Sequence, residues 1–127
     1  MGNDLNQDAE MGSIGRLTQR LCAYWNSGDL ERFMDCYERC DTVSLIAKGK
    51  RIEGWEMLYH FFSQMFAHGE RKGLLNSSNE RIAYLAQNCA TCTFDWTLVD
   101  GGRSLTGVCS LVLRKTEGEW RIVLDHS

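Results

Sequence analysis

The sequence predicts an α+β domain, with helices in its first half and an antiparallel sheet in its second half. Apolar residues recur at helical spacing as far as residue 66, and beyond residue 74 they alternate with polar residues, as in strands. Glycine-containing turns such as Asp100-Gly101-Gly102 and Thr116-Glu117-Gly118 separate alternating segments. Helices followed by a run of strands are typical of α+β proteins.

The length and composition fit one domain with its own hydrophobic core. The chain has 127 residues, of which 43% are hydrophobic and 24% are charged, and its net charge is −3. A chain of this size buries roughly two-thirds of the surface that its unfolded form exposes. The charges are interspersed and form no basic stripe of the kind that neutralises phosphates, so we expect no nucleic-acid partner.

We expect neither an export signal nor a membrane-spanning segment in this sequence. Residues 1–12 lack the cationic start and apolar stretch of a signal peptide, and we expect a flexible tail there, followed by a single domain at residues 13–127. No apolar segment is long enough to span a bilayer, so no membrane partner is expected. Cys89-Ala90-Thr91-Cys92 has the spacing of a redox or zinc pair, but it lies in a strand pattern without a partner pair or a histidine at ligand spacing. We therefore interpret the six cysteines as free thiols in the cytoplasm and expect neither a metal nor a cofactor.

Three amphipathic helices are predicted in the first half. The first begins near Ser13, carries its apolar residues on one face, and is terminated by Gly28. Asp29 can cap the second helix, which should end near Cys40. The third helix covers Trp55–Phe66, where aromatic and aliphatic residues recur at three and four positions, so this face must be buried.

The second half and the link between the helices contain the predicted strands. Alternation of apolar and polar residues, bounded by glycine turns, places them at residues 43–47, 51–53, 74–85, 88–99, 103–115 and 119–126. In the 88–99 strand, Phe94 and Trp96 share the face that should meet the helices. The opposite face of the sheet is β-branched and only half polar, which suits a subunit interface and predicts a homodimer.

Four landmarks resemble a known family. In chain order they are Trp25-Asn26-Ser27-Gly28-Asp29-Leu30, Asp41-Thr42-Val43, Ile52-Glu53-Gly54 and the ending Gly118-Glu119-Trp120-Arg121-Ile122-Val123-Leu124-Asp125-His126-Ser127. Their order and spacing resemble the SnoaL-like branch of the nuclear-transport-factor-two-like superfamily. The resemblance implies a cone of three N-terminal helices on a strongly curved, mixed but mostly antiparallel sheet, a pocket inside the cone, and dimerisation through the outer sheet face.

His126 is the first candidate for a catalytic residue. Strict alternation places it in phase with Trp120 and Ile122, so its imidazole would point into the cone and could act as a general acid or base. Asp125 would face the other way, and Asp95 is expected to be a solvated or interface charge. The residues that could line a cavity for a flat apolar ligand, or could simply fill the core, are Tyr24, Trp25, Trp55, Tyr59, Phe62, Phe94 and Trp96.

The sequence leaves two functions open. The first is a SnoaL-like enzyme that binds a small apolar molecule and uses general acid–base chemistry as an isomerase, cyclase, dehydratase or hydrolase. The second is a non-catalytic ligand-binding or dimeric assembly module, because the superfamily hosts many unrelated functions. Steroid isomerases of the superfamily use a Tyr and an Asp at positions that hold Leu21 and Leu45 here, so that mechanism is not available.

Overall fold

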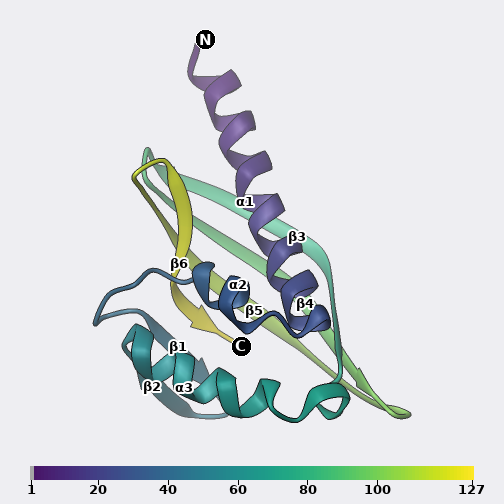
Figure 1. Cartoon of the computed structure of the whole chain (residues 1–127). Helices are drawn as coiled ribbons and strands as arrows, with labels where there is room; N and C mark the ends of the chain where they lie inside the picture. Colours follow the sequence, from purple (N-terminus) through teal and green to yellow (C-terminus); the bar gives the residue numbers. More distant parts are fainter. Residues whose placement is uncertain (1) are drawn as a thin grey trace.

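The described residues form three α-helices and one six-stranded sheet (Figure 1). A computed structural model describes the backbone of residues 2–127 and the side chains of residues 7–69 and 72–127. The helices are α1 (Gly2–Ser27), α2 (Leu30–Asp35) and α3 (Trp55–Phe66), and the short 3-10 helix η1 (Gly69–Lys72) follows α3. The strands are β1 (Ser44–Ala47), β2 (Lys50–Glu53), β3 (Leu74–Ala86), β4 (Cys89–Asp100), β5 (Arg103–Thr116) and β6 (Glu119–His126). None of the described helices combines the length and apolar character needed to cross a membrane.

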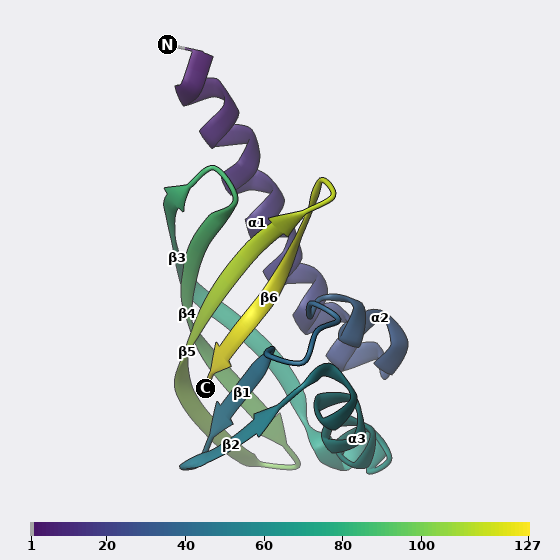
Figure 2. The ribbon, with the colours of Figure 1, turned by 90° about the vertical axis from the view of Figure 1, so that its left-hand side faces the viewer.

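The strands form a single mixed sheet in the order β2-β1-β6-β5-β4-β3. Among the described strands, every neighbouring pair is antiparallel except β1 with β6, which is parallel. Figure 2 shows the long strands curving past α1, while β1 and β2 lie next to α3. The prediction of helices packed on a curved, mixed but mostly antiparallel sheet is confirmed.

The first helix begins earlier than the sequence indicated. We expected residues 1–12 to form a tail, but α1 starts at Gly2 and continues without a break past residue 13. Adding a residue to an existing helix is far easier than starting one, so a polar stretch can extend a helix without an apolar face of its own. The Glu10 carboxylate also anchors this part of α1 to the sheet, because it accepts hydrogen bonds from Lys115 Nζ at 2.9 Å and Trp120 Nε1 at 2.7 Å.

The second helix is shorter than predicted, although its cap is the expected one. The Asp29 carboxylate accepts a hydrogen bond from the backbone amide of Arg32 at 3.1 Å and so satisfies a free amide of the first turn. The helix ends at Asp35 rather than near Cys40. The residues that follow form backbone hydrogen bonds to β6 instead of continuing the helix.

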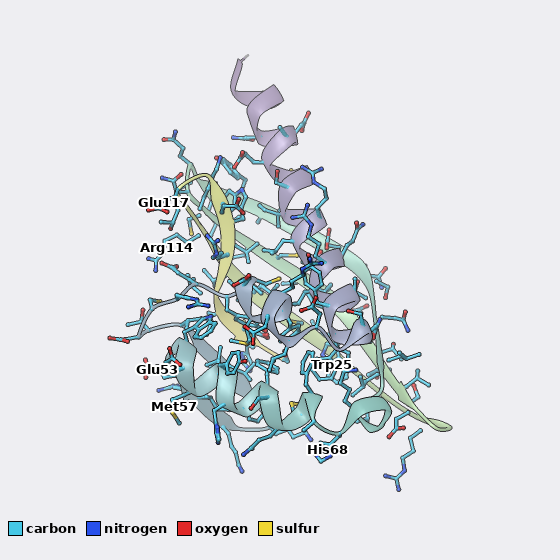
Figure 3. The ribbon with its side chains drawn as sticks, in the orientation of Figure 1. Trp25, Glu53, Met57, His68, Arg114 and Glu117 are labelled. Atoms are coloured by element: carbon cyan, nitrogen blue, oxygen red, sulfur yellow. The ribbon has the colours of Figure 1, made fainter. Side chains whose placement is uncertain are left out.

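A cluster of aromatic side chains joins the three helices. Figure 3 shows Trp25 where the end of α1 meets α3. Its ring centroid lies 5.8 Å from that of Phe33 in α2 and 5.3 Å from that of Phe66 in α3, and the Phe33 and Phe62 centroids are 4.8 Å apart. As predicted, α3 buries its aromatic face, whereas Met57 points away from the core and is 59% exposed (Figure 3).

A β-bulge in β6 reverses the predicted orientation of the end of that strand. The pairing of β5 with β6 skips Val123, which has no partner in β5. An extra residue moves every later side chain to the other face of the sheet. Asp125 therefore faces the interior, opposite the buried Leu111, whereas His126 is exposed opposite Ser110. The prediction that His126 points inward and Asp125 outward is wrong for this reason.

Candidate functional site: a cavity with a buried carboxylate

An apolar cavity of about 420 Å³ lies between the helices and the inner face of the sheet. Its wall includes residues of α1, α2 and α3 together with residues of β1, β4, β5 and β6. Most of the lining side chains are hydrophobic, and a cavity of this size and character suits a small molecule. The charged or hydroxyl-bearing side chains in the wall are those of Tyr37, Lys48, Lys50, Asp125 and Ser127.

Four of the seven aromatic residues predicted to line a cavity do line this one. They are Trp25 of α1, Phe62 of α3, and Phe94 and Trp96 of β4. The two β4 residues are two positions apart, so they share the face of the sheet that meets the helices, as the alternation predicted. Helical spacing and strand alternation were therefore sufficient to find this part of the wall.

The other three aromatic residues lie outside the cavity. Trp55 is buried under the guanidinium of Arg39, which is 4.1 Å from the ring centroid, and its indole Nε1 donates to the Met34 carbonyl at 3.1 Å. The Tyr59 hydroxyl donates to an acidic residue of α2 at the surface. Tyr24 lines a separate polar cleft on the other side of α2. All three residues belong to the apolar faces of α1 and α3. Only part of each face lines the cavity, and these residues lie on the remaining part.

One carboxylate is buried in the wall of this apolar cavity. Asp125 is 5% exposed, and three donors surround its two oxygens. The Tyr37 hydroxyl donates to Oδ2 at 2.7 Å, and the Ser127 hydroxyl donates to Oδ1 at 2.6 Å. The Cys109 thiol donates to Oδ1 at 3.4 Å. A carboxylate removed from water needs such donors, because an unpartnered one is strongly destabilising.

Backbone pairing places Tyr37 beside this carboxylate. The amide of Ile122 donates to the Cys36 carbonyl at 2.8 Å, and the amide of Glu38 donates to the Ile122 carbonyl at 2.9 Å. These two bonds hold Tyr37 alongside Ile122, immediately before the bulge. Because the bulge then turns Asp125 inward, the buried phenol and the carboxylate meet in the wall of the cavity.

Burial keeps the donors around Asp125 protonated. Desolvation, followed by the nearby Asp125 carboxylate, raises the pKa of Tyr37 well above its ordinary value. Desolvation and the same carboxylate also raise the pKa of the Cys109 thiol beyond its usual range. Within the described part of the chain, no Lys, Arg or His forms an ion pair with Asp125, so neutral donors hold it in place. No group of three His, Cys, Asp or Glu among the described residues is placed to hold a metal ion.

The other polar candidates lie on the outer surface. His126 is exposed and does not line the cavity. Asp95 lies on the outer face of β4 opposite Val108, and its Oδ2 accepts a hydrogen bond from the Asn79 side chain at 2.7 Å. The position of Asp95 agrees with the surface charge that we expected.

Sequence reasoning missed both Tyr37 and Asp125. One signal for Asp125 was available in the three successive apolar residues Ile122, Val123 and Leu124. Strict alternation would place a polar residue in the middle of this run, so the run indicates that the alternation is interrupted there, as it is at a β-bulge. Tyr37 had no such signal, since its spacing from Phe33 continues a helical apolar face. Only the pairing between distant segments reveals that it meets the carboxylate.

Comparisons with known proteins identify the family. Residues 14–127 match the model of the SnoaL-like domain. The chain belongs to the SnoaL-like domain family. No curated protein matches the sequence of this SnoaL-like domain. The family fold is one that binds small molecules, in agreement with the cavity.

Solved structures resemble this SnoaL-like domain over nearly its whole length. An NTF2-like protein of unknown function from Shewanella oneidensis MR-1 is 27% identical with a TM-score of 0.87, covering 92% of this chain and 97% of that chain. An NTF2-like superfamily protein from Salmonella enterica serovar Typhimurium LT2 is 23% identical with a TM-score of 0.79, covering 94% and 90%. An NTF2-like protein of unknown function from Pseudomonas putida KT2440 is 13% identical with a TM-score of 0.80, covering 94% and 85%.

The buried carboxylate of this SnoaL-like domain comes from β6. Leu21 and Leu45, which stand where the steroid isomerases of the superfamily carry a Tyr and an Asp, both line the cavity. Their aliphatic side chains offer no proton donor or acceptor there. The carboxylate and phenol come instead from Asp125 and Tyr37.

Proposed function

We propose that this SnoaL-like domain binds a small apolar molecule in the cavity and that Asp125 serves as its general base or acid, with Tyr37 as the neighbouring hydrogen-bond donor. The observation that carries the proposal is a buried carboxylate in the wall of an otherwise mostly apolar cavity of about 420 Å³. Titratable groups placed in this way are typical of functional sites. Asp125 thus takes the role that the sequence had assigned to His126.

The arrangement supports proton transfer on a ligand that carries a carbonyl or hydroxyl group. Each oxygen of Asp125 accepts a hydrogen bond from a hydroxyl, Tyr37 on Oδ2 and Ser127 on Oδ1, which fixes the direction of the carboxylate toward the cavity. Such a fixed carboxylate can remove a proton from the ligand without first reorienting. The Tyr37 phenol stays protonated at neutral pH and uses its one proton to hold Oδ2, so it positions the carboxylate for the proton transfer. Isomerases, dehydratases and cyclases share this step.

Binding is the first part of the proposal to test. A titration with the apolar dye 8-anilinonaphthalene-1-sulfonate, monitored by dye fluorescence, should give saturable binding to the folded protein. Ala47 is half-buried in the cavity wall, and Ala47→Phe should fill the space and weaken dye binding. The matched control is Met57→Phe, on the exposed side of α3, which should bind the dye as the unmodified protein does. Equal binding by all three proteins would overturn the cavity as the binding site.

Catalysis is tested with a ligand that native mass spectrometry detects on the purified protein. Asp125→Asn should retain that ligand but lose its conversion, because the amide keeps the size of the carboxylate and cannot accept a proton. His126→Ala should leave conversion unchanged, since the imidazole lies outside the cavity. Loss of conversion in His126→Ala alone would restore the original assignment and refute the role of Asp125.

A homodimer through the outer sheet face is the second proposal, and it also fits a non-catalytic assembly module. Val108 lies on this face and is 61% exposed, and Val112 lies on the same side of β5 beyond Ser110. Exposed apolar residues on an otherwise polar sheet face favour a subunit interface. Native mass spectrometry should find a dimer that Val108→Arg converts to a monomer and Met57→Arg does not. A monomer in the unmodified protein at micromolar concentration would refute this proposal.

The cysteines support the cytoplasm as the compartment of this domain. All six are free, and four of them are buried. Extracellular domains of similar size more often carry disulfides, whereas the cytosol keeps thiols reduced.

A further inference from the structure

A second cleft, separate from the apolar cavity, gathers four arginines. It has a volume of about 490 Å³ and lies between α1, α2 and the start of β6. Its charged lining residues are Arg16 and Arg20 of α1, Arg32 and Asp35 of α2, and Glu119 and Arg121 of β6. Guanidinium groups outnumber carboxylates in this cleft, although the whole chain has a net charge of −3.

The spacing along α1 explains half of this cluster. Arg16 and Arg20 are one helical turn apart, and Tyr24 follows one turn later, so the three side chains line the same cleft. Two like charges at this spacing repel each other and destabilise the helix. A bound anion would remove that repulsion.

The protein itself neutralises these arginines only in part. Arg121 Nε donates to the backbone carbonyl of Asp35 at 3.3 Å, and Arg16 donates to a serine hydroxyl at 3.1 Å, so neither acceptor carries a charge. Arg32 pairs with Asp29 at 3.6 Å, but its side chain is 70% exposed and such a pair is weak. Arg20 makes no hydrogen bond or ion pair with any other described side chain. Donor groups therefore remain available in the cleft.

The buried thiol of Cys36 in this cleft is unreactive. The Cys36 side chain is 4% exposed, and its pKa is raised to about 12, mainly by desolvation and then by Asp35. Arg20 and Arg121 line the cleft together with Cys36 and act in the opposite direction on the pKa of its thiol. Because the thiol stays protonated, it provides neither a nucleophile nor a metal ligand. The cleft therefore has the means to bind an anion but no group to react with it.

We propose that this cleft binds a small anion carrying at least two negative charges, such as the phosphate group of a metabolite, with Arg20 and Arg121 as its main ligands. The planar guanidinium matches two oxygens of a phosphate or carboxylate at once, which makes Arg the preferred side chain for such groups. Arg16 and the Tyr24 hydroxyl line the same cleft and can add further donors. This binding site is independent of the apolar cavity and of its proposed chemistry.

The test is a calorimetric titration with pyrophosphate at constant ionic strength. The unmodified protein should bind one pyrophosphate saturably, and the double variant Arg20→Gln/Arg121→Gln should bind it at least about tenfold more weakly, as expected when two charge-assisted hydrogen bonds are lost. Arg103→Gln is the matched control, since Arg103 is exposed in the β4–β5 hairpin outside the cleft, and it should bind like the unmodified protein. Arg20→Gln alone changes only an exposed side chain, so it provides the same test if the double variant does not fold.

Thermal unfolding provides a second readout. A ligand that binds only the folded state raises the melting temperature, so pyrophosphate should stabilise the unmodified protein and Arg103→Gln, but not the double variant. Sodium chloride at the same ionic strength should not reproduce this effect. Equal stabilisation by sodium chloride, or equal pyrophosphate affinity in the double variant and the unmodified protein, would overturn the proposal.

Discussion

Replacing Tyr37 by Phe should destabilise the protein by about 1.5–3 kcal/mol, the range found for hydrogen bonds to charged groups. The change removes the hydroxyl that donates to Asp125 Oδ2 at 2.7 Å, and no other described residue donates to that oxygen. Tyr37 is 1% exposed, so its hydroxyl is shielded from bulk water in the folded protein. The ring keeps its aromatic neighbours, Phe33 at 5.7 Å and Phe62 at 5.8 Å, so little packing is lost.

The destabilisation should depend on pH in one direction. The fold raises the pKa of Tyr37 above its ordinary value of 10.0, so the folded state keeps the phenol proton where the unfolded state releases it. The stabilisation from Tyr37 is therefore complete below pH 10.0 and is lost as the pH rises above that value. Tyr37→Phe lacks this titration, and the difference in stability between the two proteins should shrink above pH 10.0.

Urea unfolding, followed by tryptophan fluorescence at pH 7 and at pH 10.5, measures both effects. The matched control is Tyr59→Phe, which removes a hydroxyl that bonds Glu31 at the surface and should change stability too little to measure. A loss of less than about 0.5 kcal/mol in Tyr37→Phe at pH 7 would show that Asp125 finds another donor. In that case the buried carboxylate would not depend on Tyr37, and the reasoning from this hydrogen bond would be wrong.

Three further predictions concern packing, charge and thiols. Gly107→Ala should cost about 1–3 kcal/mol in urea unfolding, because a Cβ would lie 2.5 Å from the Trp96 ring; unchanged stability would contradict this. Glu10→Gln should lower the free energy of unfolding by less than about 1 kcal/mol at neutral pH. The hydrogen bond from Lys115 lowers the pKa of Glu10 from 4.5, so thermal unfolding should show that the two proteins become equally stable at acid pH. Ellman's reagent should react rapidly only with the two half-buried thiols of the native protein, Cys40 and Cys89.

The sequence predicted the architecture because its signals are local. Helical spacing identified α3 and its buried face, and a single residue, Asp29, identified the cap of α2. Alternation and glycine turns identified the four long strands of the sheet. Each of these signals depends on neighbours within one turn or one hairpin, which a single sequence contains. The start of α1 was missed because a helix can continue through residues that have no apolar pattern.

The centre of the candidate site was missed because it depends on pairing between distant segments. A one-residue bulge decides which of Asp125 and His126 reaches the cavity, and alternation alone cannot place such a bulge. Tyr37 reaches the same place only because the chain leaves α2 and bonds to Ile122. The aromatic wall, by contrast, follows from helix faces and strand parity, so Trp25 and three further aromatic residues were found without the structure.

The fold determines that there is a cavity, but it does not determine which strand supplies the polar group inside it. The packing of helices on the curved sheet creates a cavity between them. Leu21 and Leu45 line this cavity and contribute only aliphatic side chains to it. The carboxylate comes from β6, where the bulge directs the Asp125 side chain inward. The Tyr37 hydroxyl donates a hydrogen bond to it. Because this bulge lies near the end of β6, it redirects only the few residues that follow it. Family membership therefore predicts the cavity, whereas the chemistry inside it must be determined for each chain.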